Sequence, residues 1–153
     1  MVKIKLKLFE SIVGAEELFL PDSVVSVGER AFAGMQDMTD ILYLPFNINY
    51  IGPEAFYSTE VGELQLPDNL QVVHTGAFTG AVVKVLYIPQ SVERIEDGAF
   101  ENFYGNSAVY YGSQEEWENC VSIGENNEAL TNLAFTFEGQ PAEIGGMLTE
   151  TIS

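Results

Sequence analysis

Residues 42–56, with the sequence LYLPFNINYIGPEAF, hold one complete copy of a motif that recurs along the chain. The motif consists of an alternating apolar segment that ends in proline, an apolar pair three residues apart, and an Ala-Phe step. The proline segments are Leu18-Phe19-Leu20-Pro21, Leu42-Tyr43-Leu44-Pro45, Leu64-Gln65-Leu66-Pro67 and Leu86-Tyr87-Ile88-Pro89. The Ala-Phe steps are Ala31-Phe32, Ala55-Phe56, Ala77-Phe78 and Ala99-Phe100. Because the prolines lie 24, 22 and 22 residues apart, the sequence predicts an array of stacked repeats.

The alternation within each copy predicts a short β-strand. In residues 42–44 the two leucines would point to one side of the strand and Tyr43 to the other. Pro45 then ends the strand, because proline has no N–H to donate to a neighbouring strand. Phe56 is expected to fill the core, with the small Ala55 beside it leaving room. One copy is too short to bury its own apolar side, so successive copies must stack and share one core.

The order Leu-x-Leu-Pro, Val-x-x-Val-Gly and Ala-Phe resembles the BspA-like, or treponemal-type, leucine-rich repeats over about residues 16–137. Val27-Gly28 and Ile51-Gly52 match the Ile-Gly step of that family, whereas Val73-His74 and Ile95-Glu96 depart from it. The predicted fold is a β-rich, right-handed solenoid, leucine-rich-repeat-like, with four to five coils of 22–24 residues. The resemblance further implies a bacterial surface or secreted protein that serves in adhesion or host-protein binding.

Both ends of a solenoid need caps, since the terminal core and sheet edge would otherwise stay open. We therefore interpret residues 1–137 as one capped repeat domain. Its parts are an N-terminal cap strand at 1–15, repeats at 16–112 and a C-terminal cap at 113–137. Residues 138–153 are expected to form a polar tail.

The predicted C-terminal cap contains a short helix. Ser113 followed by Glu116 three residues later is typical of a helix start, and Trp117 is expected to anchor the helix in the core. Residues 109–112 are aligned one period after residues 86–89 and are predicted to form a fifth strand. Residues 134–137 are predicted to be the final strand.

Charge excludes some partners. The 153 residues contain 23 Asp and Glu but six Lys and Arg, which gives a formal net charge of −17. A surface this negative repels phosphate backbones and anionic membranes, so nucleic acid is not an expected partner. No segment approaches the roughly 20 apolar residues of a membrane span, and no export signal of ordinary length follows the start. The sequence thus predicts neither membrane insertion nor a visible signal peptide.

Residues suited to catalysis are few. His74 is the only histidine and Cys120 the only cysteine, and the two belong to different predicted elements. The sequence has no zinc-ligand spacing, phosphate-binding glycine loop or EF-hand loop. We therefore expect no enzymatic activity, no cofactor and no catalytic or metal site.

The candidate ligand-binding residues belong to the outward side of the strands. If the leucines point inward, one column of outward side chains would follow from the repeat. Its members are Phe19, Tyr43, Gln65, Tyr87 and Tyr110. Rigid aromatic rings are enriched at binding surfaces, but such a column can also stabilise the sheet by contacts between rings.

The resulting hypothesis is a non-catalytic binding module that contacts a protein or glycan through this strand face. The alternative is a structural spacer or tip component of a larger assembly such as a phage tail. Neither the identity of the ligand nor the oligomeric state follows from the sequence.

Overall fold

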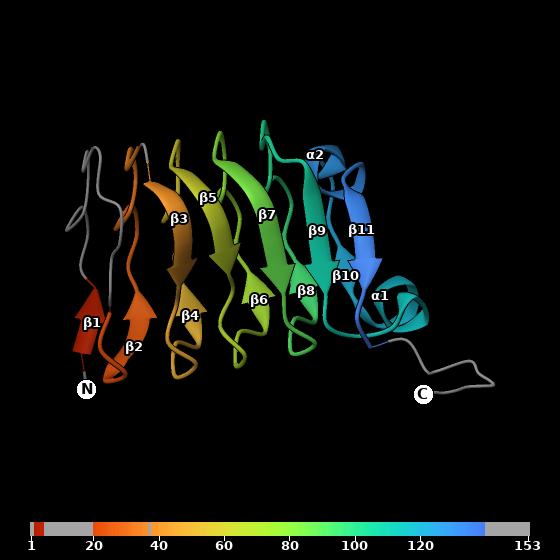
Figure 1. Cartoon of the computed structure of the whole chain (residues 1–153), viewed down its shortest axis with the longest axis horizontal. Coiled ribbons are helices and arrows are strands. Elements are labelled where there is room, and N and C mark those ends of the chain that lie inside the picture. Colours follow the sequence, from red (N-terminus) through yellow and green to blue (C-terminus); the bar gives the residue numbers. More distant parts are fainter. Residues whose placement is uncertain (1, 5–19, 37, 140–153) are drawn as a thin grey trace.

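The computed structural model describes residues 2–4, 20–36 and 38–139. Over these residues the chain winds into a parallel β-solenoid, whose coils succeed one another along a single axis (Figure 1). A typical coil carries a long strand on one side and a short strand on another, and turns join them. The solenoid predicted from the repeat is confirmed.

The long strands form one sheet, which we call the long sheet. In the described residues it has five strands in the order β11-β9-β7-β5-β3, and every neighbouring pair is parallel. The bounds are β3 Met38–Tyr43, β5 Glu60–Gln65, β7 Val82–Ile88, β9 Ser107–Tyr110 and β11 Ala134–Phe137.

The short strands form two smaller parallel sheets within the described residues. The first has the order β1-β2-β4, with β1 at Val2–Ile4, β2 at Val24–Val27 and β4 at Tyr50–Ile51. The second has the order β10-β8-β6, with β6 at Val72–Val73, β8 at Arg94–Ile95 and β10 at Ser122–Ile123.

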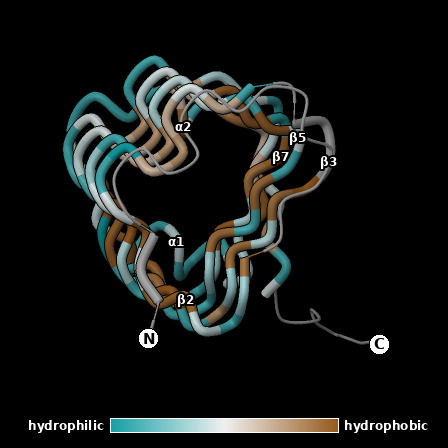
Figure 2. The backbone as a smooth tube through the Cα atoms, turned by 90° about the vertical axis from the view of Figure 1, so that its left-hand side faces the viewer, coloured by the Kyte–Doolittle hydropathy of each residue, from teal (hydrophilic) through white to brown (hydrophobic). Residues whose placement is uncertain are grey.

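The register of the sheets aligns the same motif position in successive coils. Leu42 pairs with Leu64, and Leu64 pairs with Leu86, and all three side chains are buried. Viewed along the axis, the coils superimpose, with hydrophobic residues concentrated along the sides that carry the strands (Figure 2). The leucines of the repeat therefore line one continuous core, as the alternation predicts.

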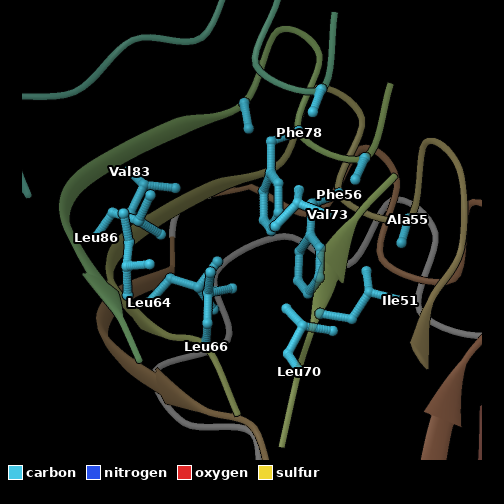
Figure 3. Close-up of a cluster of buried hydrophobic side chains, with 14 of the residues drawn as sticks. Ile51, Ala55, Phe56, Leu64, Leu66, Leu70, Val73, Phe78, Val83 and Leu86 are labelled. Atoms are coloured by element: carbon cyan, nitrogen blue, oxygen red, sulfur yellow. The ribbon is translucent and has the colours of Figure 1, made fainter. Parts of the chain in front are cut away.

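The Ala-Phe steps form a second column inside the core. The rings of Phe32, Phe56, Phe78 and Phe100 are buried and stack in order, with 5.0 Å between successive centroids and interplanar angles of 6–9°. The N–H groups of the first three donate to the carbonyl oxygen of the alanine in the next coil, each at 2.8 Å. Figure 3 shows Phe56 and Phe78 among the buried leucines and valines of their coils. The prediction that these phenylalanines fill the core is confirmed.

At the N-terminal end, β1 pairs in parallel with β2, so a strand lies against the first coil as the sequence predicts. Residues 5–15 of the predicted N-terminal cap lie outside the described residues.

The C-terminal cap begins with α1 at Gln114–Cys120. The Ser113 hydroxyl accepts a hydrogen bond from the backbone N–H of Glu116 at 3.1 Å, which confirms the predicted helix start. Trp117 is 8% exposed, and its ring centroid lies 4.8 Å from that of Phe135 in β11. The predicted helix, anchor and final strand are therefore all present in the cap.

The chain then passes through α2, at Glu128–Thr131, to reach β11. Glu138 and Gly139, the first residues of the predicted tail, donate backbone hydrogen bonds to the carbonyl oxygens of Tyr110 at 2.9 Å and Gly112 at 3.1 Å. Residues 140–153 lie outside the described residues.

A buried asparagine ends the column of Ala-Phe steps at its C-terminal side. Asn127 is 2% exposed, and its Oδ1 accepts the backbone N–H of Phe100 at 2.9 Å. In the preceding coils an alanine carbonyl of the next coil occupies this role. The Nδ2 of Asn127 donates to the carbonyl oxygens of Glu96 at 2.9 Å and Gly124 at 3.0 Å. One side chain thus replaces backbone that a further coil would have provided.

Truncation of a central phenylalanine should be costly. We expect Phe56→Ala or Phe78→Ala to lower the free energy of unfolding by about 3–5 kcal/mol, through lost transfer energy and a cavity between stacked rings. Chemical denaturation followed by circular dichroism measures this change. Tyr104→Ala provides the control, since the Tyr104 side chain is exposed. A core variant as stable as this control would contradict the assignment.

Removal of the cap should cause self-association. A chain that ends after Gly112 loses α1, β10, α2 and β11, which uncovers the edge of β9 and the core residue Tyr110. We expect the truncated chain to form larger species in multi-angle light scattering at concentrations where the full chain does not. A truncated chain that stays folded and monomeric would show that the cap is dispensable.

Candidate binding face

The outward side of the long sheet carries three of the candidate residues in one row. Tyr43 pairs with Gln65, and Gln65 pairs with Tyr87, so the three side chains occupy the same position on adjacent strands. Tyr43 is 58% exposed, while Gln65 and Tyr87 are partly buried. Their backbones are about 4.8 Å apart from strand to strand, which is the ordinary spacing in a sheet.

Tyr110 does not belong to this row, and its predicted outward orientation is wrong. The residue that pairs with Tyr87 is Val109, whereas Tyr110 pairs with the inward-facing Ile88 and is 1% exposed. The ring of Tyr110 packs on Trp117, with 5.1 Å between centroids. The sequence alignment was shifted by one residue, and such a shift moves every side chain of a strand to the opposite face.

Tyr111 lies two residues after Val109, just past the end of β9, and its ring extends the row; sequence reasoning did not select it. Its ring is nearly parallel to that of Tyr87, with a centroid distance of 6.2 Å and an interplanar angle of 15°. Its hydroxyl donates to Oε1 of Gln65 at 3.4 Å. The adjacent tyrosines at positions 110 and 111 were the available signal, because alternation places one of them inward and the other outward. We call Tyr43, Gln65, Tyr87 and Tyr111 the tyrosine row.

Phe19, the remaining candidate, lies outside the described residues. The neighbouring outward row is mostly apolar: Ile41, Glu63 and Val85 pair in sequence across β3, β5 and β7, and all three are partly buried. The two rows together form an aromatic and aliphatic surface, in which Glu63 is the carboxylate of the second row.

Negative charge surrounds the phenolic groups of the row. Oε1 of Glu63 accepts the Tyr87 hydroxyl at 3.0 Å, and this hydrogen bond is the main reason that the pKa of Tyr87 is raised. Burial raises the pKa of Tyr111, and the charges of Glu138 and Asp68 add to that effect. A tyrosine hydroxyl is protonated at neutral pH at its ordinary pKa of about 10, and the raised pKa of both groups keeps them hydrogen-bond donors.

A different cluster lies on the short-strand side. Nδ1 of His74 is 3.3 Å from Oε1 of Glu96, and the imidazole packs at 5.1 Å from the ring of Tyr50. The backbone N–H of Thr75 also donates to Glu96, and this bond is the main cause of the lowered pKa of that carboxyl group. His74 and Glu96 stand at the positions that Gly28 and Gly52 occupy in earlier coils, so they fill the turn with a side-chain contact.

A shallow groove of about 310 Å³ adjoins this cluster, with Arg94, Glu96 and Ser122 in its lining. Cys120 is exposed on α1, in a different element from His74. Among the residues that the structure describes, no group of three or more His, Cys, Asp or Glu side chains could hold a metal ion.

A family model for the BspA type leucine rich repeat region matches residues 2–126 in six copies, and the chain belongs to this family. The family is generally a non-catalytic, protein-binding or adhesion-type repeat module, and it is associated with surface or secreted proteins. A search among curated proteins gave no significant match.

The register of β9 can be tested by comparing two tyrosines. Tyr110→Ala should lower the free energy of unfolding by about 3–5 kcal/mol, as for other large aromatic residues in a core. Tyr43→Ala removes a mostly exposed ring and should change the stability much less. Thermal or urea denaturation of both variants checks the difference. Equal losses, or a larger loss for Tyr43, would contradict the inward position of Tyr110 and the outward position of Tyr43.

Proposed function

We propose that this chain is a non-catalytic binding module that contacts a protein or a glycan through the tyrosine row. The observation that carries the proposal is that large rings remain on the outer side of a sheet whose inner side already buries the leucines of the repeat. Tyr43 is 58% and Tyr111 is 40% exposed, so their rings still have apolar area to lose to a partner. Tyrosine offers this area at a low cost in side-chain entropy.

The chemistry of the remaining surface supports binding rather than catalysis. In the described part of the chain His74 contacts Glu96 and Tyr50, and neither of these contacts activates a nucleophile. The membership in a family of generally non-catalytic modules agrees with this.

The proposed location is the surface or exterior of a bacterial cell, which the association of the family with surface or secreted proteins supports. None of the helices in the described ranges is long and apolar enough to cross a membrane.

The double variant Tyr43→Ser with Tyr87→Ser tests the proposed contact surface. A partner captured by a pull-down should bind this variant with a loss of at least about 2 kcal/mol, because aromatic anchors dominate contact energies. Titration calorimetry on wild type and variant measures the loss.

The melting temperature of the same double variant should fall modestly, since both rings lie on the outer side of the sheet. Tyr104→Ser is the matched control, because the Tyr104 side chain is exposed outside the tyrosine row. A marked fall in melting temperature with unchanged affinity would mean that the rings stabilise the sheet and do not contact the partner.

A further inference from the structure

We propose that the tyrosine row binds arginine side chains of a partner protein. This inference rests on the function proposed above and narrows its ligand to one chemical class. Two properties of the face support it: rings that are held in place, and carboxylates near them. A third observation comes from another part of the chain, where an arginine is bound by a tyrosine and a carboxylate.

Two rings of the row, those of Tyr87 and Tyr111, are held in place before any partner arrives. The Tyr87 hydroxyl is bonded to Glu63 at 3.0 Å, the Tyr111 hydroxyl is bonded to Gln65 at 3.4 Å, and the two rings stack on one another. The faces of such rings carry partial negative charge and attract cations. Because the rings are already ordered, a partner's cation loses its own freedom but does not have to order the site as well.

Carboxylates lie where a cation on the rings could reach them. Glu63 belongs to the neighbouring outward row, and its Oε1 accepts a hydrogen bond from the Tyr87 hydroxyl. The charges of Glu138 and Asp68 lie close enough to Tyr111 to raise the pKa of its hydroxyl. A guanidinium group suits this combination, because it is flat, stacks on aromatic faces and donates hydrogen bonds to carboxylates in its own plane.

The chain contains an internal example of the proposed contact. The guanidinium carbon of Arg30 lies 5.1 Å from the centroid of the Tyr57 ring, and its Nη1 is 3.0 Å from Oε1 of Glu54. Tyrosine, carboxylate and arginine thus come together at a turn of the solenoid. On the long sheet, the tyrosine row and Glu63 in the neighbouring row supply the tyrosine and the carboxylate.

Charge complementarity points to an external source for the arginine. In the described strands of the long sheet the single basic residue is Lys84, near the start of β7, while Arg30 and Arg94 have carboxylate partners elsewhere. The chain carries a formal charge of −17, which attracts basic segments of other proteins and speeds their encounter. An extended segment presents every second side chain on one side at intervals of about 6.6–6.8 Å, close to the 6.2 Å between the Tyr87 and Tyr111 rings.

This spacing defines the probe. The capped peptide acetyl-Arg-Ser-Arg-Ser-Arg-amide is titrated into the full chain by calorimetry, together with versions in which lysine or glutamine replaces every arginine. We expect the arginine peptide to bind most tightly, the lysine peptide more weakly and the glutamine peptide not measurably. Affinity should fall as salt is raised from low to physiological concentration, because exposed charges contribute.

Variants assign the binding to the tyrosine row. The double variant Tyr43→Ser with Tyr87→Ser, and separately Glu63→Gln, should each weaken the arginine peptide by about fivefold or more. The matched controls are Tyr104→Ser and Glu101→Gln, which remove an exposed ring and an exposed charge outside the row. The controls should leave the affinity within about twofold of wild type.

Three results would overturn the inference. If Glu101→Gln weakens the peptide as much as Glu63→Gln does, the peptide responds to net charge and not to the row. If a partner from the pull-down needs Tyr43 and Tyr87 but the arginine peptide does not compete with it, the proposed function stands and the arginine preference is wrong. If the affinity of the partner from the pull-down is unchanged by the substitutions of Tyr43 and Tyr87, both proposals fail.

Discussion

The hydrogen bonds from the N–H groups of Phe32, Phe56 and Phe78 to the alanine carbonyl of the next coil set the spacing between coils, on which the rest of the structure depends. They hold the rings of Phe32, Phe56, Phe78 and Phe100 at 5.0 Å, which is close to the roughly 4.8 Å between paired strands. Ring stacking and strand pairing therefore favour the same rise per coil. Each buried ring also contributes on the order of 1.5–3 kcal/mol of transfer free energy. The column of phenylalanines therefore both sets the spacing of the coils and stabilises the fold.

A uniform rise has a second effect on the outer surface. Once the leucines of adjacent coils are in register on the inner side, the residues between them must also be in register on the outer side. The outward positions of Tyr43, Gln65 and Tyr87 follow from this alternation. Tyr111 follows the end of β9 and joins the row through the contact of its ring with Tyr87. The added hydrogen bonds, from Tyr87 to Glu63 and from Tyr111 to Gln65, then fix the orientation of the rings.

The sequence predicts those features that are written locally and repeated. Leu-x-Leu-Pro and Ala-Phe recur with a regular step, so the solenoid, the buried phenylalanines and the outward position of Tyr43 and Tyr87 could be predicted. The last strand of the repeat lacks this information, because in the observed register Tyr111 stands where earlier copies have proline. Its register depends on the packing of Tyr110 against Trp117, and that contact comes from a helix that follows the strand.

The role of Asn127 at the end of the core was not predicted, for a similar reason. Its partners are the N–H of Phe100 and carbonyl oxygens of Glu96 and Gly124, and the first two lie far from it in the sequence. No local pattern distinguishes this asparagine from the other polar residues near it. A buried amide with both its ends bonded becomes visible as a structural element only when the preceding coil is in place.

The replacement of a backbone carbonyl by the Asn127 side chain also bears on how such a chain can change its length. The C-terminal cap contacts only the last coil: Asn127 accepts the backbone N–H of Phe100, and Trp117 packs on Tyr110. These contacts do not depend on how many coils precede the last one. Duplication or loss of a whole unit in the interior therefore leaves the terminus chemically intact. Since each unit adds one position to each outward row of the long sheet, gene duplication can lengthen the tyrosine row by one side chain at a time while the core and the chain end stay the same.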